Sequence, residues 1–153
     1  MDRPRTTMAM LAAVVLTAGL SASALAADDA EPEPVGVFGI EGMTWLLTSQ
    51  AVDGEMVAVP DGIVVSLLME DGRASGTGGC YSYFGTYELD GFDVTFGKIG
   101  STLMACPAPA GDVESAYFAN LGLVASYQSG GIQMAFLDVD GGVILEFGLA
   151  PEV

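Results

Sequence analysis

The stretch Gly76-Thr77-Gly78-Gly79-Cys80, followed by Ser101-Thr102-Leu103-Met104-Ala105-Cys106-Pro107, decides how this chain folds. It contains both cysteines of the chain and its densest cluster of glycines. Because glycine lets strands bend or approach one another closely, the cluster predicts a bulge or a tight strand crossing beneath Trp45. An even number of cysteines favours a disulfide if the protein is exported. Whether the protein is exported therefore decides how the two cysteines are interpreted.

Residues 1–26 have the pattern of a secretory signal peptide. Arg3 and Arg5 give a positive start, and the run from Met8 to Leu20 is apolar or small. Ala24-Leu25-Ala26 then offers a cleavage site of small residues. The apolar run is short for a membrane span, which needs roughly 20 residues. The sequence therefore predicts cleavage, no stable membrane anchor, and a periplasmic or secreted protein.

Cys80 and Cys106 are predicted to form a disulfide in that oxidising compartment. Closing a loop of this length would stabilise the fold by about 3–4 kcal/mol in the chain-entropy model. A soft-metal site, with the thioether of Met104 as a further ligand for Cu(I), is one alternative. Two free thiols are the other. The absence of histidine, and the presence of two cysteines that can bond each other, favour the structural disulfide.

Charge and composition narrow the classes of function. The 153 residues include 20 carboxylates and four cations, a formal net charge of −16. Such a surface repels phosphate backbones, so we expect no nucleic acid partner, whereas a cationic protein is electrostatically compatible. The carboxylates could also serve only to keep a small exported protein soluble. Histidine is absent, which removes the usual general base near neutral pH and every Ser–His or Cys–His nucleophile. We expect no catalytic residue, no cofactor and no metal site.

The mature chain is predicted to be one mainly β domain. Residues 27–41 are acidic and punctuated by proline, which predicts a flexible leader. Residues 42–149 form the domain and residues 150–153 a tail. Short apolar or alternating runs between turn residues indicate about eight antiparallel strands in a curved sheet or an open barrel. The expected strands are 44–50, 63–69, 73–78, 83–89, 92–96, 125–129, 132–137 and 143–148.

Two of these strands and the helix have a predicted inward face. Alternation directs Phe92, Val94 and Phe96 to one side, and Ile132, Met134 and Phe136 to one side of a later strand. Residues 112–122 are expected to form the single helix, with Asp112 as its N-cap. The apolar face of that helix consists of Val113, Tyr117, Leu121 and Val124.

Two further groups of residues have a functional and a structural interpretation. Asp138-Val139-Asp140-Gly141-Gly142 resembles the start of a calcium loop, but the twelfth position is Leu149 and aspartate with glycine also suits a hairpin turn. The tyrosines could line a concave ligand-binding face or be ordinary cross-strand partners. These tyrosines are Tyr81, Tyr83, Tyr87 and Tyr127.

Several motifs occur together along almost the whole mature chain. They are Gly42-x-x-Trp45-x-Leu47, Ser75-Gly76-Thr77-Gly78-Gly79-Cys80, Gly85-x-Tyr87, Ser101-Thr102-Leu103-Met104-Ala105-Cys106-Pro107, Glu114-x-x-Tyr117-Phe118-x-x-Leu121 and Leu137-Asp138-x-x-Gly141-x-x-x-Leu145-x-Phe147. In this order and spacing they resemble the META domain, also called the HslJ-like family. One position departs from the family pattern: asparagine usually follows the first cysteine, and here that residue is Tyr81.

The resemblance implies a mostly β, lipocalin-like or barrel-like fold with a single helix. It implies no defined catalytic activity, because members are described as heat-inducible envelope proteins, factors in tolerance of a hydrophobic antibiotic, or secreted proteins. We therefore expect an exported, monomeric, non-catalytic accessory or binding protein of the cell envelope, associated with stress or drug tolerance. The alternatives are a barrel that binds a small hydrophobic ligand, and an inhibitor or partner of a basic exported protein.

Overall fold

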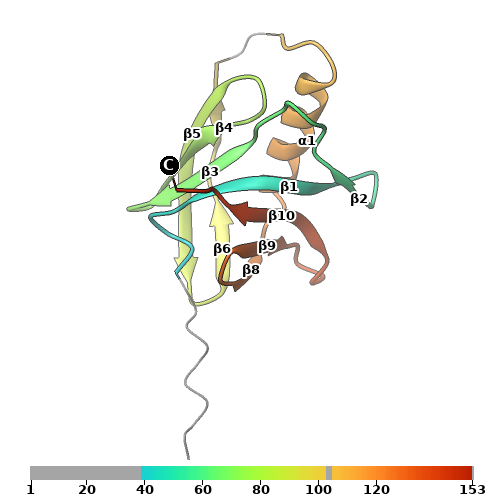
Figure 1. The fold of residues 1–153 in the computed structure, drawn as a ribbon. Helices are drawn as coiled ribbons and strands as arrows, with labels where there is room; N and C mark the ends of the chain where they lie inside the picture. Colours follow the sequence, from blue (N-terminus) through green and yellow to red (C-terminus); the bar gives the residue numbers. More distant parts are fainter. Residues whose placement is uncertain (1–38, 103–104, 153) are drawn as a thin grey trace, which may run out of the picture. The chain divides into compact units, whose positions relative to one another are not determined.

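The computed structural model describes residues 39–102 and 105–152. The predicted signal peptide, the leader up to residue 38, Met104 and Val153 lie outside these ranges. The described residues form ten strands in one antiparallel sheet and one helix (Figure 1). Their bounds are β1 (Thr44–Val52), β2 (Glu55–Ala58), β3 (Ser66–Glu70), β4 (Arg73–Thr77), β5 (Ser82–Asp90), β6 (Asp93–Phe96), β7 (Gly100–Ser101), α1 (Ala110–Leu121), β8 (Ser126–Gly130), β9 (Gln133–Leu137) and β10 (Val143–Leu149).

Eight of the strands close into a barrel. Their order is β1, β3, β4, β5, β6, β8, β9 and β10, and β10 pairs back with β1. The closing ladder pairs Trp45 with Leu149 and Leu47 with Phe147. The seam between β6 and β8 is short, with Asp93 opposite Ser126. The mainly β fold with a single helix is confirmed, and the pairing of β1 with β10 closes the barrel that the sequence suggested would be open.

The two strands outside the barrel are β2 and β7. The sequence reading missed β2, although Asp53 and Gly54 carry the signal of a hairpin. Both have positive φ, 51° and 82°, as in a two-residue type I′ turn. This turn pairs Glu55 with Val52 and folds β2 back onto β1. β2 ends the strand order, so it is an edge strand of the described sheet.

Two hairpin turns lie one residue later than the sequence suggested. β5 and β6 pair Asp90 with Asp93, and β8 and β9 pair Gly130 with Gln133. The two-residue loops therefore contain Phe92 and Ile132, whose side chains are 56% and 69% exposed. The prediction that these two side chains face inward is wrong, because each belongs to a turn. The later alternation holds on both strands: Val94, Phe96, Met134 and Phe136 are buried.

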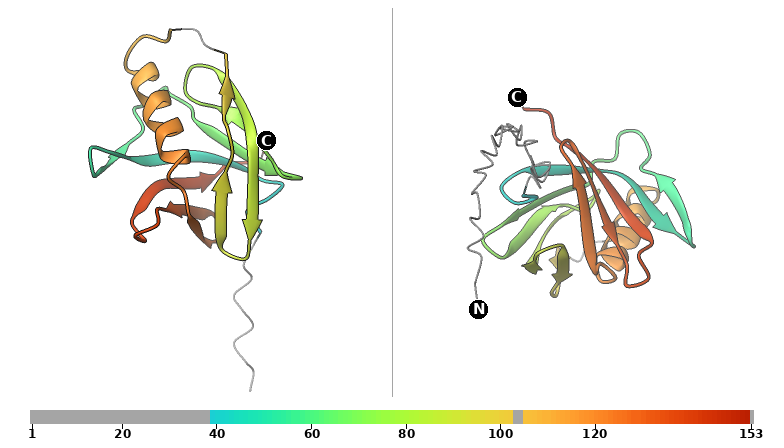
Figure 2. Two further views of the ribbon diagram at one scale, coloured as in Figure 1. Left: turned by 180° about the vertical axis from the view of Figure 1, so that it is seen from behind. Right: turned by 90° about the horizontal axis from the view of Figure 1, so that it is seen from below.

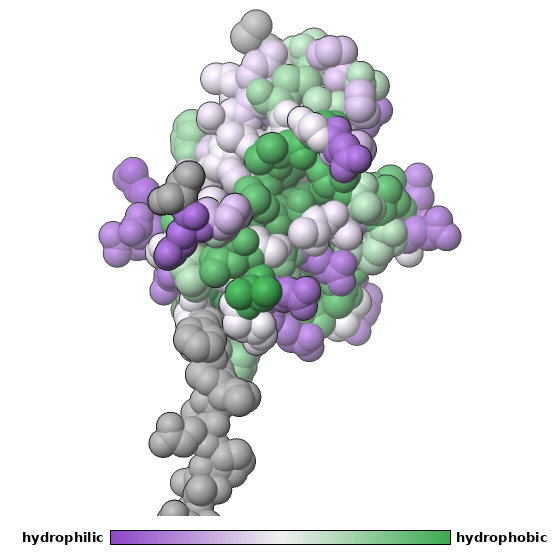
Figure 3. Space-filling view, viewed as in Figure 1, coloured by the Kyte–Doolittle hydropathy of each residue, from purple (hydrophilic) through white to green (hydrophobic). Residues whose placement is uncertain are grey.

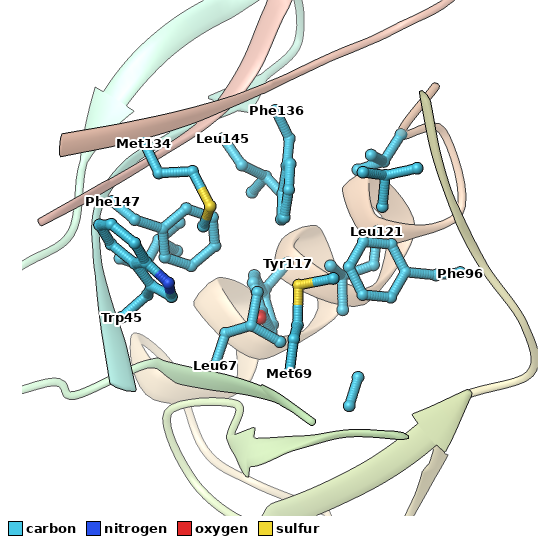
Figure 4. Close-up of a cluster of buried hydrophobic side chains, with 14 of the residues drawn as sticks. Trp45, Leu67, Met69, Phe96, Tyr117, Leu121, Met134, Phe136, Leu145 and Phe147 are labelled. Carbon is cyan, nitrogen blue, oxygen red and sulfur yellow. The ribbon is translucent and has the colours of Figure 1, made fainter. Parts of the chain in front are cut away.

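The barrel interior is filled by apolar side chains. Trp45 and Leu67 are fully buried, and Phe136 and Leu145 meet them from β9 and β10 (Figure 4). The ring of Phe136 makes edge-to-face contacts with those of Phe96 and Phe147, with centroids 5.5 Å apart in both pairs. The Trp45 indole donates a hydrogen bond of 2.9 Å to the carbonyl of Ile40. The polar atom of this buried ring is therefore satisfied at the start of the domain.

The helix packs against β1 and β10 (Figure 2). It contributes its predicted apolar face to the core. Val113, Tyr117 and Leu121 are all buried. The helix begins at Ala110, with Pro109 at the N-cap position, and no side chain caps it. The prediction that Asp112 is the N-cap is thus wrong: Pro109 takes that position, three residues earlier, and Asp112 lies in the first turn, where the helix dipole favours negative charge.

Candidate functional site

Three of the motifs that carry the family resemblance, those with Cys80, Cys106 and Glu114, meet where α1 is joined to the barrel. Cys80, in the loop between β4 and β5, forms a disulfide with Cys106, which precedes α1. The predicted pairing is therefore present. Gly111 allows the start of α1 to approach the backbone of Cys106 closely, because a Cβ at this position would overlap the Cys106 carbonyl. We call the contacts between the β4–β5 loop, β5 and α1 that surround this disulfide the clasp.

Glu114 holds the clasp together from the first turns of α1. Its Oε2 accepts hydrogen bonds from the backbone N–H groups of Tyr81 at 3.0 Å and Cys80 at 3.3 Å. A Cβ on Gly78 would lie 2.7 Å from the same oxygen. The glycine cluster therefore makes room for a helix glutamate and for the start of β3, since a Cβ on Gly76 would overlap the carbonyl of Ser66.

Behind the disulfide, two tyrosines form a buried hydrogen-bonded chain. The hydroxyl oxygens of Tyr83 and Tyr117 are 2.7 Å apart, and the Tyr83 hydroxyl donates to the carbonyl of Ser66 at 2.8 Å. Since that carbonyl can only accept, the Tyr83 hydroxyl donates its hydrogen bond there. The Tyr117 hydroxyl therefore donates to the Tyr83 oxygen. Burial raises the pKa of Tyr83 well above its usual value, and burial together with the neighbouring Tyr83 does the same for Tyr117. Both hydroxyls stay neutral throughout the physiological range.

The four tyrosines singled out from the sequence do not form a ligand-facing surface together. Tyr83, Tyr87 and Tyr127 are 2%, 5% and 5% exposed, so their rings belong to the core. The Tyr87 hydroxyl donates to the Glu41 carboxylate, and the Tyr127 ring packs 5.6 Å from that of Phe92. Tyr81 is half-buried. The ligand-facing prediction is corrected for the three buried tyrosines, because the interior they face is packed with side chains.

The Asp138 segment is a turn. Oδ1 of Asp138 accepts hydrogen bonds from the backbone N–H groups of Asp140 at 3.0 Å and Gly142 at 2.9 Å. This is the side-chain-to-backbone bonding that favours aspartate in turns. In residues 39–102 and 105–152, no cluster of three or more cysteine, aspartate or glutamate side chains is placed to hold a metal ion.

On the other side of α1 lies a site that no sequence pattern predicts. A hollow of about 230 Å³ is lined by Val52, Val57 and Val59 from the β1–β2 hairpin and the segment after it, and by Val113 and Ala116 from α1. Gln50 also lines it, and we call it the Gln50 hollow. Figure 3 shows hydrophobic side chains gathered on the face where the hairpin passes α1.

Gln50 is 3% exposed and only half of its amide is satisfied. Its Nε2 donates to the carbonyl of Val113 at 3.1 Å, whereas Oε1 has no hydrogen-bond partner among the described residues. A register shift between Leu47 and Ser49 on the β1–β10 ladder puts Gln50 inside. Strict alternation from Trp45 and Leu47 would turn Ser49 inward instead, so no local pattern predicts this buried amide.

The two positively charged side chains of the described residues line the same hollow. Arg73 and Lys98 line a hollow of about 470 Å³ together with Phe84, which is 70% exposed. Phe84 lies on β5 between Ser75 of β4 and Gly100 of β7. All carboxylates of the described residues, by contrast, are at least partly exposed.

No described helix has both the length and the apolar character needed to span a bilayer.

Comparison with known proteins places this geometry in a family. The META domain model matches residues 39–150. A solution structure of a protein from Burkholderia xenovorans is 30% identical, with a TM-score of 0.61, and the match covers 74% of this chain and 85% of that one. A second solution structure is 19% identical, with a TM-score of 0.54 and coverages of 72% and 91%.

A crystal structure of a DUF4847 family protein from Bacteroides vulgatus shares the fold at 14% identity, with a TM-score of 0.53, and the match covers 74% of this chain and 96% of that one. No curated protein sequence matches the chain. The family match runs from before β1 to the end of β10, so it includes both the barrel and the clasp. This chain belongs to the META domain family.

Proposed function

We propose that this protein is an exported, monomeric, non-catalytic accessory protein of the cell envelope that acts by binding and contributes to stress or drug tolerance. One observation carries the proposal: the polar groups of the family residues that lie in the clasp are already engaged with other parts of the chain. Both cysteines share a disulfide, Oε2 of Glu114 accepts two backbone hydrogen bonds, and the Tyr83 and Tyr117 hydroxyls bond each other. A disulfide of this kind is typical of proteins outside the reducing cytosol.

Cell fractionation with mass spectrometry tests the export. We expect a chain that begins at Ala27, in the periplasm or the medium, with a mass two hydrogens below that of the reduced form. A strain that lacks the protein should become more sensitive to a hydrophobic antibiotic, and the wild-type gene should restore tolerance. An uncleaved chain with two free thiols in the cytosol would contradict the export. Turnover in a broad substrate screen would contradict the non-catalytic role.

A second candidate function is capture of a basic exported protein. The observation that favours it is the distribution of charge: Arg73 and Lys98 are confined to one hollow, so the rest of the described surface presents carboxylates. Such a surface speeds the approach of a cationic partner and selects against anionic ones. A lysine-rich peptide should bind at about 0.1 M salt and dissociate at about 1 M, because the Debye length falls from about 10 Å to about 3 Å. Binding that ignores salt would exclude this function.

The packed interior bears on the remaining alternative, a small hydrophobic ligand. Fully buried side chains such as Trp45, Leu67 and Phe136 occupy the barrel (Figure 4). A ligand would therefore need a site outside the barrel axis, between the barrel and the elements that cover it.

A further inference from the structure

We propose that the Gln50 hollow binds a small, neutral, apolar molecule that carries one hydrogen-bond donor. The inference starts from the orientation of the Gln50 amide. The Val113 carbonyl can only accept a hydrogen bond, so Nε2 must face it and Oε1 must face elsewhere. Flipping the amide would set two acceptors against each other. The fold thus fixes which atom of the amide is unpaired.

An unpaired acceptor in this position calls for a donor from outside the chain. Roughly nine in ten buried polar groups of native proteins have a partner, and a buried group without one lowers stability. Oε1 of Gln50 is such a group, and Gln50 is at the same time part of the wall of a hollow. Because the oxygen is itself closed to solvent, a ligand that enters the hollow must shift the Gln50 side chain before it donates one hydrogen bond to the oxygen and covers the apolar wall.

The wall selects the rest of the ligand. Val52, Val57, Val59 and Val113 are apolar, and a charged head group pressed against them would lose its hydration without compensation. Asp112 is the charged residue among those lining the hollow, and it would repel an anion. A hydroxyl or an amide N–H on an otherwise apolar molecule meets these conditions. The volume of about 230 Å³ is below the roughly 300–1,000 Å³ of sites for drug-sized molecules, so we expect a ligand of about one ring.

The hollow lies at the edge of the described sheet. It lies between the edge hairpin β1–β2 and α1, and its two sides belong to different elements of the fold. The edge of β2 also offers another way to cover it, since a second copy of the chain could add a strand there. The experiment below separates these occupants. The inference does not depend on capture of a basic protein, and each can fail alone.

A series of three probes of similar size tests the ligand chemistry. Phenol has a donor, toluene has none, and benzaldehyde has an acceptor only. We would titrate each into the isotope-labelled protein and follow amide signals by NMR. Phenol should bind roughly fivefold to tenfold more tightly than toluene, because one hydrogen bond distinguishes them. Benzaldehyde should bind no more tightly than toluene. Shifts should centre on Val57, Ala116 and the Gln50 side-chain amide.

Variants of the protein test the location. Gln50→Met keeps the length of the side chain but removes the acceptor, so phenol and toluene should then bind equally. Ala116→Leu narrows the hollow from the helix and should weaken both probes at least fivefold. Ala119→Leu adds the same group to an exposed position of α1 outside the hollow and should leave both affinities unchanged. If Gln50→Met fails to fold, the Ala116 and Ala119 pair still decides the location.

Three outcomes would overturn the proposal. Equal binding of phenol and toluene to the wild-type protein would remove the role of the Gln50 oxygen. Shifts remote from the β1–β2 hairpin and α1 would remove the site. Sedimentation that shows a dimer, with no probe binding until it dissociates, would assign the hollow to a second copy of the chain. None of these outcomes touches export or antibiotic tolerance, which are measured in cells.

Discussion

The two sides of α1 differ in how completely their polar groups are paired. Toward the β4–β5 loop, the carboxylate of Glu114 and the hydroxyl of Tyr117 are engaged with the barrel. Toward the β1–β2 hairpin, Gln50 leaves one buried oxygen unpaired beside a hollow. Glu114 and Tyr117 are among the residues that carry the family resemblance, and Gln50 is not. The clasp therefore preserves the joint between helix and barrel, while the capacity to bind is located across the helix from it.

Loss of the disulfide should have the largest effect on this comparison. The double variant Cys80→Ser/Cys106→Ser opens a loop with a sequence separation of 26 residues. We expect its free energy of unfolding to fall by about 3 kcal/mol, because the unfolded chain regains the entropy of the open loop. Urea unfolding of the variant and of the reduced wild-type protein should give the same midpoint. A fall below about 1 kcal/mol would mean that Glu114 and the tyrosines hold the clasp without the disulfide.

A matched pair of substitutions compares the two sides of the helix directly. Glu114→Met leaves the N–H groups of Cys80 and Tyr81 without their acceptor, and we expect a loss of about 2 kcal/mol. Gln50→Met removes one hydrogen bond but also removes an unpaired oxygen, so its effect should stay below about 1 kcal/mol. Denaturant unfolding measures both. Equal losses would show that Gln50 is as much a structural residue as Glu114.

The tyrosine chain sharpens the description of the clasp. Tyr83→Phe leaves both the Ser66 carbonyl and the Tyr117 hydroxyl without a partner, whereas Tyr117→Phe removes a single donor. We therefore expect losses of about 2 and about 1 kcal/mol, respectively, in the free energy of unfolding. The reverse order would mean that Tyr117 donates elsewhere and that the chain of hydrogen bonds runs in the other direction.

Much of the fold could be predicted from local patterns. The strand with Trp45, the buried face of α1 and the pairing of Cys80 with Cys106 depend on spacing along the chain, and the structure has all three. Phe92 and Ile132 were misplaced because a turn shifted by one residue moves a side chain from the core to the loop. Alternation predicts the side of a strand, but the turn decides where the alternation starts.

The candidate site could not be found in the same way. Gln50 turns inward through the register shift near Ser49, which depends on how β1 meets β10, nearly a hundred residues away. The tyrosines illustrate a second limit. Sequence places Tyr83 and Tyr87 on the inner side of β5, but only packing from the other strands and α1 shows that this side is a filled core. Long-range packing, rather than any motif, therefore determines which surfaces are open.

The smallest expected effect concerns Tyr87. This buried tyrosine bonds to Glu41 and does not line the Gln50 hollow. Burial, together with its hydrogen bond to Glu41, raises the pKa of Tyr87 to about 12. Below pH 10 both folded and unfolded states keep the proton and the stability is fully present. Between pH 10 and 12 the unfolded state loses the proton first, so stability falls as pH rises.

Because the hydroxyl of Tyr87 lies near the surface, solvent reduces this contribution to about 0.5 kcal/mol in total. Tyr87→Phe should therefore flatten the fall of the free energy of unfolding with pH, by about that amount in total between pH 9 and pH 11.5, measured by urea unfolding. An unchanged slope would assign the alkaline loss to Tyr83 and Tyr117, whose pKa values are also raised by burial. Alkaline unfolding would then begin at the clasp, and the paired side of α1 would be the more sensitive to pH.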